Sequence, residues 1–190
     1  GKVEKRMTDQ KPQGYAVQLY FDKDVEKQFF AYRESIYKLG LMPVLGKMND
    51  RPHVSLAVFG EADAEKLFDL TSKFAKKIAQ LPVRLESIGL FPTDSNVIYL
   101  TPIPTIALLT IHKQYHVHLS EAKLTSFPYY LPDRWVPHCT LESDLEKEQL
   151  DLAARLCQMT FSPIKGMFTS LGIISYYPIS YLAEFPLSVE

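Results

Sequence analysis

Apolar and polar residues follow two different periods along the chain, and the changes of period divide it into strands and helices. Residues 15–21 (YAVQLYF) are rich in β-branched and aromatic side chains, which is typical of a strand. Over residues 22–40 apolar side chains recur every three or four positions and stop at a glycine, which indicates a helix. The same patterns predict strands over 51–60, 83–91, 96–102, 136–143, 164–177 and 180–187, and helices over 61–80, 103–120 and 144–159.

Strands and helices are mixed along the chain, and some neighbouring strands are joined only by turn-rich residues such as PTDS at 92–95. This order favours an α+β fold with antiparallel sheets over a doubly wound parallel sheet, in which a crossover helix joins the strands. Residues 1–13 are polar and are expected to be a flexible tail. Residues 14–190 are expected to form the folded domain.

Composition limits the classes of function that remain. Of the 190 residues, 46% are apolar and 23% are charged, as in a globular protein of one domain or two small lobes that share a core. The formal net charge of −1 excludes a generally basic surface, so an anionic ligand is expected to be small or locally held. The sequence contains no run of eighteen apolar residues, and its two cysteines are too few for a disulfide framework. We therefore expect a soluble, cytoplasmic protein with reduced cysteines, no membrane segment and no obligate protein partner, acting as a monomer.

One predicted strand begins with a titratable side chain. Successive side chains of a strand point to opposite faces. In RPHVSLAVFG (51–60) the face predicted to lie in the core carries Val54, Leu56 and Val58. The opposite face, predicted to be a site, carries His53, Ser55 and Ala57. The imidazole and the hydroxyl, two residues apart, would lie about 6.5–7 Å apart along the strand, near enough to contact one small anion.

The same pattern occurs a second time. DRPHVSL (50–56) and DRWVPHCTL (133–141) share Pro-His-x-(Ser/Thr)-Leu, and an Asp-Arg pair precedes each copy. With 13 prolines and 5 histidines, a random order would place Pro before His less than once on average. We infer a duplicated strand-and-helix unit, with the two copies facing each other across a cleft.

Two histidines and two hydroxyls suit the cleavage of a phosphodiester. The reaction needs one proton removed from the attacking oxygen and another delivered to the leaving oxygen, and imidazoles with pKa values near 6.5 can do both. The hydroxyls of Ser55 and Thr140 can donate to the phosphate oxygens on which charge develops. This scheme requires no metal and no other cofactor.

These motifs resemble those of a known family. His53-Val54-Ser55-Leu56 and His138-Cys139-Thr140-Leu141 are similar to the paired His-x-Thr/Ser motifs of the 2H phosphoesterase superfamily, which includes the 2′-5′ RNA ligases and 2′,3′-cyclic nucleotide phosphodiesterases. The resemblance covers residues 15–185. It implies two pseudo-symmetric α+β lobes around a central cleft, with each inner strand giving one histidine and one hydroxyl. It also implies that His53 and His138 are the acid and the base, in an order that the sequence leaves open.

An aromatic segment before the second motif offers contacts for the rest of a nucleotide. SFPYYLPDRW (126–135) contains Tyr130 and Trp135, which are suited to stacking an unpaired base, and Arg134, which is suited to attracting an anion. Tyr177, at the end of the predicted strand 164–177, is expected to line the same pocket. Hydrophobic cover over the lobe is the alternative role for the aromatic residues.

Three functions follow from these residues. The first is a metal-independent phosphodiesterase for a 2′,3′-cyclic phosphate or 2′-5′ linkage of RNA ends or small nucleotides. The second is a protein of the same fold that binds a nucleotide or an RNA end without turnover, or one with 2′-5′ RNA ligase activity. The third is a metal enzyme, because His112 and His116 are four residues apart on a predicted helix, a spacing at which two imidazoles can share zinc.

Overall fold

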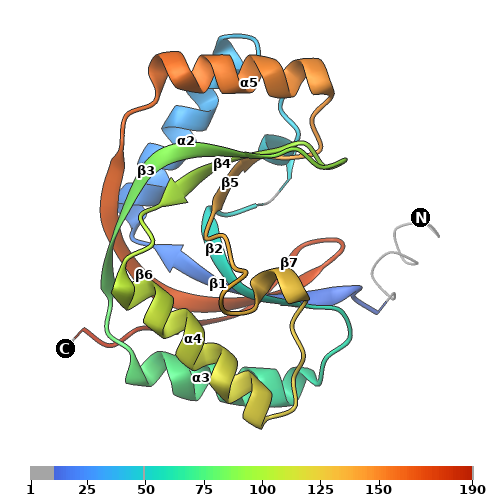
Figure 1. The fold of residues 1–190 in the computed structure, drawn as a ribbon, viewed down its shortest axis with the longest axis vertical. Coiled ribbons are helices and arrows are strands. Elements are labelled where there is room, and N and C mark those ends of the chain that lie inside the picture. Colours follow the sequence, from blue (N-terminus) through green and yellow to red (C-terminus); the bar gives the residue numbers. More distant parts are fainter. Residues whose placement is uncertain (1–10, 49, 190) are drawn as a thin grey trace.

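A computed structural model describes residues 11–48 and 50–189 (Figure 1). The first ten residues of the expected tail lie outside this range. In chain order the elements are β1 (Gly14–Phe21), α2 (Lys23–Lys38), the 3-10 turn η1 (Leu45–Lys47), β2 (His53–Phe59), α3 (Ala64–Lys77), β3 (Leu81–Phe91), β4 (Val97–Pro102), α4 (Ile106–Glu121), the 3-10 turn η2 (Pro128–Tyr130), β5 (Cys139–Glu142), α5 (Lys147–Thr160), β6 (Ile164–Tyr176) and β7 (Ser180–Pro186).

Every strand and helix expected from the sequence is present, and the α+β architecture with antiparallel strands is confirmed. Three helices begin where a side-chain oxygen accepts a hydrogen bond from a backbone N–H of the first turn: Asp22 for α2, Asp63 for α3 and Thr105 for α4. After α2, Gly40 adopts a φ of 119°, a conformation that glycine reaches without steric cost.

The buried face of α5 differs from the one that the apolar spacing predicts. The spacing of Leu145, Leu152, Leu156 and Met159 in the sequence predicts one buried stripe, but Leu145 precedes the helix and Met159 is exposed. The buried side chains of this helix are Leu150, Ala153, Leu156 and Cys157. Small apolar side chains therefore complete the stripe, while a long one reaches solvent. Both cysteines, Cys139 and Cys157, are buried and free, as expected.

The strand order shows an internal duplication. The sheet runs β2-β1-β6-β3-β4-β5, with β7 paired to β6. The chain passes twice through the same succession of elements, first as β1-α2-β2-α3-β3 and then as β4-α4-β5-α5-β6. Four of the five pairs of corresponding elements begin the same number of residues apart: Gly14 and Val97, Lys23 and Ile106, Ala64 and Lys147, Leu81 and Ile164. The third strand of each copy pairs with the first strand of the other, so the two lobes share one sheet.

This sheet bends strongly, and the bend creates the site. In Figure 1 the long central strands β3 and β6 curve around one side of the molecule, and β2 and β5 lie near its middle. Although β2 and β5 stand at the two ends of the strand order, they are in contact. The helices pair across the duplication, α2 with α5 and α3 with α4, at the two ends of the molecule (Figure 1). None of the helices in residues 11–48 and 50–189 is long and apolar enough to cross a membrane.

Candidate active site

The two motif histidines lie at the starts of the two facing edge strands. His53 is the first residue of β2, and His138 directly precedes β5. The expectation that they lie on inner strands is wrong, because both strands end the sheet and only its curvature brings them together. The two strands are nonetheless in contact, and a charge on His138 lowers the pKa of His53.

Both imidazoles are oriented by the same backbone contact. The Nδ1 atom of His53 lies 2.6 Å from the carbonyl oxygen of Arg51, and Nδ1 of His138 lies 2.8 Å from that of Val136. A carbonyl oxygen can only accept, so each Nδ1 carries a proton and donates it. In the neutral ring the lone pair is then on Nε2, which can take up a proton as a base or, once charged, release it as an acid.

The environment favours the neutral form of both rings. Burial lowers the pKa of His53 to about 4, and a charge on His138 lowers it as well, while the hydrogen bond to Arg51 opposes the shift. Burial also lowers the pKa of His138. The His138 ring is packed edge-on against Phe91 and Tyr99, with ring centroids 4.9 and 5.4 Å away. Because a charge on one ring disfavours a charge on the other, the two rings do not carry a charge at the same time.

The hydroxyl of each motif follows its histidine, and a β-bulge follows each hydroxyl. In β2 the pairing with β1 skips Leu56, and in β5 the pairing with β4 skips Leu141, the same position of the repeat. After the first bulge the two faces exchange: Ala57 lies in the core and Val58 lines the cleft, the reverse of the expectation from strict alternation. The bulge lets both His53, at the start of β2, and Val58, near its end, line the cleft.

Two cavities adjoin the histidines and meet at shared residues. One of about 350 Å³ is lined by His53 and the other, of about 510 Å³, by His138, and both are lined by Tyr130 and Thr140. Ser55 is only 8% exposed and lies outside both sets of lining residues. Of the two predicted hydroxyls, Thr140 therefore has direct access to a ligand in the cleft.

The predicted substrate-binding residues divide between these cavities. Tyr177 lines the His53 cavity, Arg134 and Trp135 line the His138 cavity, and Tyr130 lies at the junction. The indole of Trp135 is held on one face by the His112 ring, at a centroid distance of 3.8 Å and an angle of 4°, and its Nε1 donates to the carbonyl of Ser55 at 3.0 Å. It is a fixed wall of the cleft.

The histidines of α4 hold the cleft residues in place and do not offer a metal site. Nε2 of His112 lies 2.7 Å from the carbonyl oxygen of Tyr130, and Nε2 of His116 lies 2.8 Å from that of Leu56, the bulge residue. Both nitrogens that would face a shared metal ion are therefore donating to backbone. Within the described ranges no group of three His, Cys, Asp or Glu side chains is placed to hold a metal ion. The two histidines, four residues apart, instead hold the backbone at Tyr130 and Leu56.

A second support was not visible in the sequence. Glu142, the last residue of β5, is fully buried, and its carboxylate accepts hydrogen bonds from the hydroxyl of Tyr37 at 2.5 Å and from the backbone N–H groups of Val44 and Leu45 at 3.0 and 2.5 Å. Leu45 in turn lines the His53 cavity. Glu142 therefore ties β5 to the segment that leads into β2.

The fold and this site define a class of protein, in which a duplicated unit gives one His-x-(Ser/Thr) pair from each copy to a shared cleft. The sequence model of the 2′-5′ RNA ligase superfamily matches residues 47–178. The chain belongs to this family. The comparison with curated protein sequences gave no match.

Solved structures with the same fold cover nearly the whole chain. LigT of E. coli in its apo form superposes with a TM-score of 0.63 at 18% identity, covering 94% of this chain and 99% of LigT. TT0787 of Thermus thermophilus gives 0.62 at 13% identity, covering 92% and 97%. The PDE domain of MHV ns2 gives 0.61 at 14% identity, covering 87% and 99%. At these identities the likeness concerns the fold.

Proposed function

We propose that the protein is a metal-independent phosphodiesterase that hydrolyses a 2′,3′-cyclic phosphate or a 2′-5′ linkage of RNA ends or small nucleotides. The observation that carries the proposal is the pair of imidazoles on facing strands, each with Nδ1 bound to a backbone carbonyl and Nε2 left for the reaction. Structures of the E. coli relative LigT were determined with 3′-AMP and with phosphate. We extend this class of ligand to the present chain.

We assign the base role to His53 because burial and a charge on His138 both lower its pKa. His53, with its pKa lowered to about 4, stays neutral and acts as the base that takes a proton from the attacking water. The single proton of the pair then resides on His138, which donates it to the leaving ribose oxygen. One phosphorus–oxygen bond to the attacking water forms and one to the ribose oxygen breaks. The proton taken up by His53 and the one given by His138 balance.

The hydroxyl of Thr140, which lines both cavities, donates a hydrogen bond to the non-bridging phosphate oxygens and stabilises the negative charge that builds on them. Hydrogen bonds from Thr140 and a charged His138 act together on one phosphate. Tyr130, at the junction of the cavities, is placed to contact the sugar or the base on either side.

The test is a panel of nucleoside 2′,3′-cyclic phosphates, oligoribonucleotides ending in a cyclic phosphate, and 2′-5′ linked oligoadenylates. We expect hydrolysis that survives EDTA, and a loss of about 10²–10⁴-fold in turnover for His53→Ala and for His138→Ala. The double variant should be no slower than the worse single one, because either loss breaks the proton-transfer pair. Near-native turnover by both single variants would refute the proposal. Binding without hydrolysis by the native protein would favour the non-catalytic alternative, and joining of RNA ends would favour the ligase.

A further inference from the structure

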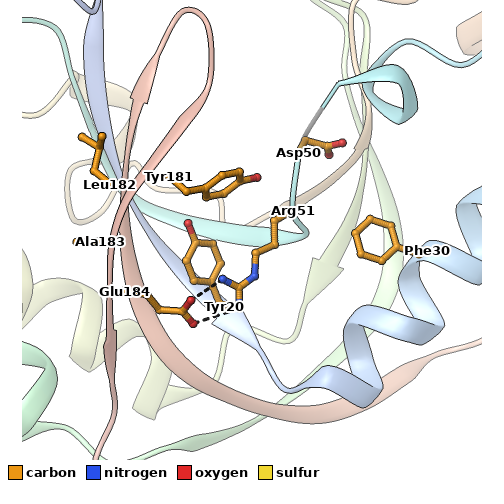
Figure 2. Close-up of a pocket in the computed structure, with 8 residues that line it drawn as sticks. All are labelled: Tyr20, Phe30, Asp50, Arg51, Tyr181, Leu182, Ala183 and Glu184. Carbon is orange, nitrogen blue, oxygen red and sulfur yellow. Dashed lines mark hydrogen bonds and ion pairs between the residues drawn. The ribbon is translucent and has the colours of Figure 1, made fainter.

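Two arginines precede the catalytic strands, and their surroundings differ sharply. Arg51 is held from two sides: its Nε lies 2.7 Å from a carboxylate oxygen of Glu26, and its Nη1 lies 2.8 Å from one of Glu184. Figure 2 shows its guanidinium beside the Tyr20 ring, 3.9 Å from the ring centroid, with two contacts to Glu184. The charge of Arg51 is thus neutralised, and its role is to fix the backbone carbonyl that orients His53.

Arg134 is in the opposite situation. Its side chain is exposed, and it forms no ion pair or hydrogen bond with another side chain of residues 11–48 or 50–189. Its guanidinium lies 5.3 Å from the centroid of the Tyr129 ring, which limits its directions without neutralising its charge. A free guanidinium presents up to five N–H donors to an anion.

The two halves of the cleft therefore carry different charges. The His138 cavity is lined by Arg134 together with the hydroxyls of Thr93 and Ser95, and its described lining includes no carboxylate. The described lining of the His53 cavity includes no lysine or arginine, and its carboxylate, Asp50, is already bound by Arg33 at 3.0 Å. One half of the cleft can hold an anion in addition to the reacting phosphate, and the other half is built for neutral groups.

We propose that the substrate carries a second phosphate, on the 5′ side of the reacting nucleoside, which Arg134 binds in the His138 half of the cleft. This inference rests on the proposed phosphodiesterase function. A nucleoside 2′,3′-cyclic phosphate with a free 5′-hydroxyl has one phosphate. An RNA that ends in a cyclic phosphate has another phosphodiester on the 5′ side of the same nucleoside, one ribose away. The hydroxyls of Thr93 and Ser95 supply further donors to that group.

The charge of this second group can be varied without altering the reacting one. The assay compares three substrates that end in the same 2′,3′-cyclic phosphate: the mononucleoside, a dinucleotide with a normal phosphodiester, and the same dinucleotide with an uncharged methylphosphonate linkage. We expect kcat/KM for the normal dinucleotide to exceed that for the methylphosphonate by about 10- to 100-fold, the range of a charge-assisted hydrogen bond. Raising the salt concentration should shrink this ratio.

Arg134→Gln isolates the residue. It should reduce kcat/KM for the charged dinucleotide to about that for the methylphosphonate, while the values for the mononucleoside change little. The matched control is Arg155→Gln, which removes the same charge from an exposed position of α5. It should keep the native ratio. Because Arg134 is exposed and unpaired, its replacement should leave thermal unfolding unchanged.

The failures of the two proposals are distinguishable. If Arg134→Gln hydrolyses all three substrates with the native ratios, or if the native enzyme does not distinguish the two dinucleotides, the second phosphate site is refuted and the phosphodiesterase stands. If the native protein hydrolyses none of them, the phosphodiesterase is refuted. Calorimetric binding of dinucleotides with a 3′-phosphate, with normal and methylphosphonate linkages, then tests Arg134 on its own: equal affinities for the two would overturn it.

Discussion

The clearest test of the proton transfer is the pH dependence of kcat/KM, which reports the ionisation of the free enzyme. His53 must be neutral to act as the base, so kcat/KM should rise with pH through its pKa of about 4. His138 must be protonated to act as the acid, so kcat/KM should fall as pH rises through its pKa, which burial places below the usual value of about 6.5. The maximum should therefore lie above about pH 4 and on the acid side of neutrality.

The size of the effect follows from the same values. Because burial lowers the pKa of His138, the ring is mostly neutral above pH 7, and kcat/KM should fall about tenfold per pH unit there. A bound phosphate attracts the charged ring, so the alkaline limb of kcat should lie at a higher pH than that of kcat/KM.

Initial rates on a nucleoside 2′,3′-cyclic phosphate, measured from pH 4 to 9 at constant ionic strength, give both profiles. Unfolding curves at the acid end separate titration of His53 from loss of the fold. His138→Ala should abolish the alkaline limb along with most of the turnover. A native kcat/KM that stays level from pH 7 to 9 would show that His138 is not the acid.

Three further predictions concern His112, the hydroxyls of Thr140 and Ser55, and Glu142. Burial lowers the pKa of His112 to about 4, so between that pH and about 6.5 the unfolded chain binds one proton more than the folded protein. Urea unfolding should therefore show about 2 kcal/mol less stability from this residue at pH 5 than at pH 7. His112→Gln should reduce this pH dependence. Thr140→Ala should cost about 10–10³-fold in turnover and Ser55→Ala clearly less, because Thr140 lines both cavities, and equal losses would contradict this assignment. Glu142→Ala leaves four donors without their acceptor and should lower the free energy of unfolding by about 3 kcal/mol, with Glu142→Gln milder. An unchanged urea midpoint would show that the segment 44–45 does not depend on it.

The sequence predicts the fold well where local signals agree. Alternating and helical periods, together with caps such as Asp22 and Asp63, locate each strand and helix to within a few residues. The repeated Pro-His-x-(Ser/Thr)-Leu predicts the duplication; the family model confirms the family, and the solved structures confirm the fold. The roles of His53 and His138 remain predictions that the proposed assays test.

The features that could not be predicted from the sequence depend on contacts between residues that are distant in the chain. A bulge at Leu56 exchanges the faces of Ala57 and Val58, and nothing in the local pattern distinguishes it from regular alternation. Arg51 and Arg134 each follow an aspartate, and only the fold shows that Glu26 and Glu184 neutralise the first. The pair His112 and His116 has the spacing of metal ligands but lies against backbone carbonyls that the sequence cannot place.

The exchange of third strands explains why a site forms at the edges of this sheet. Because β6 and β3 are inserted between β1 and β4, the motif strands β2 and β5 are driven to opposite ends, and they can meet only if the sheet bends. Edge strands leave backbone groups unpaired, which makes them prone to unwanted pairing. In β2 three edge carbonyls have partners: that of Ser55 accepts from Trp135, that of Leu56 from His116, and that of Val58 from the backbone N–H of Phe127. The same contacts hold the start of β2 beside that of β5, so the Nε2 atoms of His53 and His138 and the hydroxyl of Thr140 stay available to the proposed phosphate.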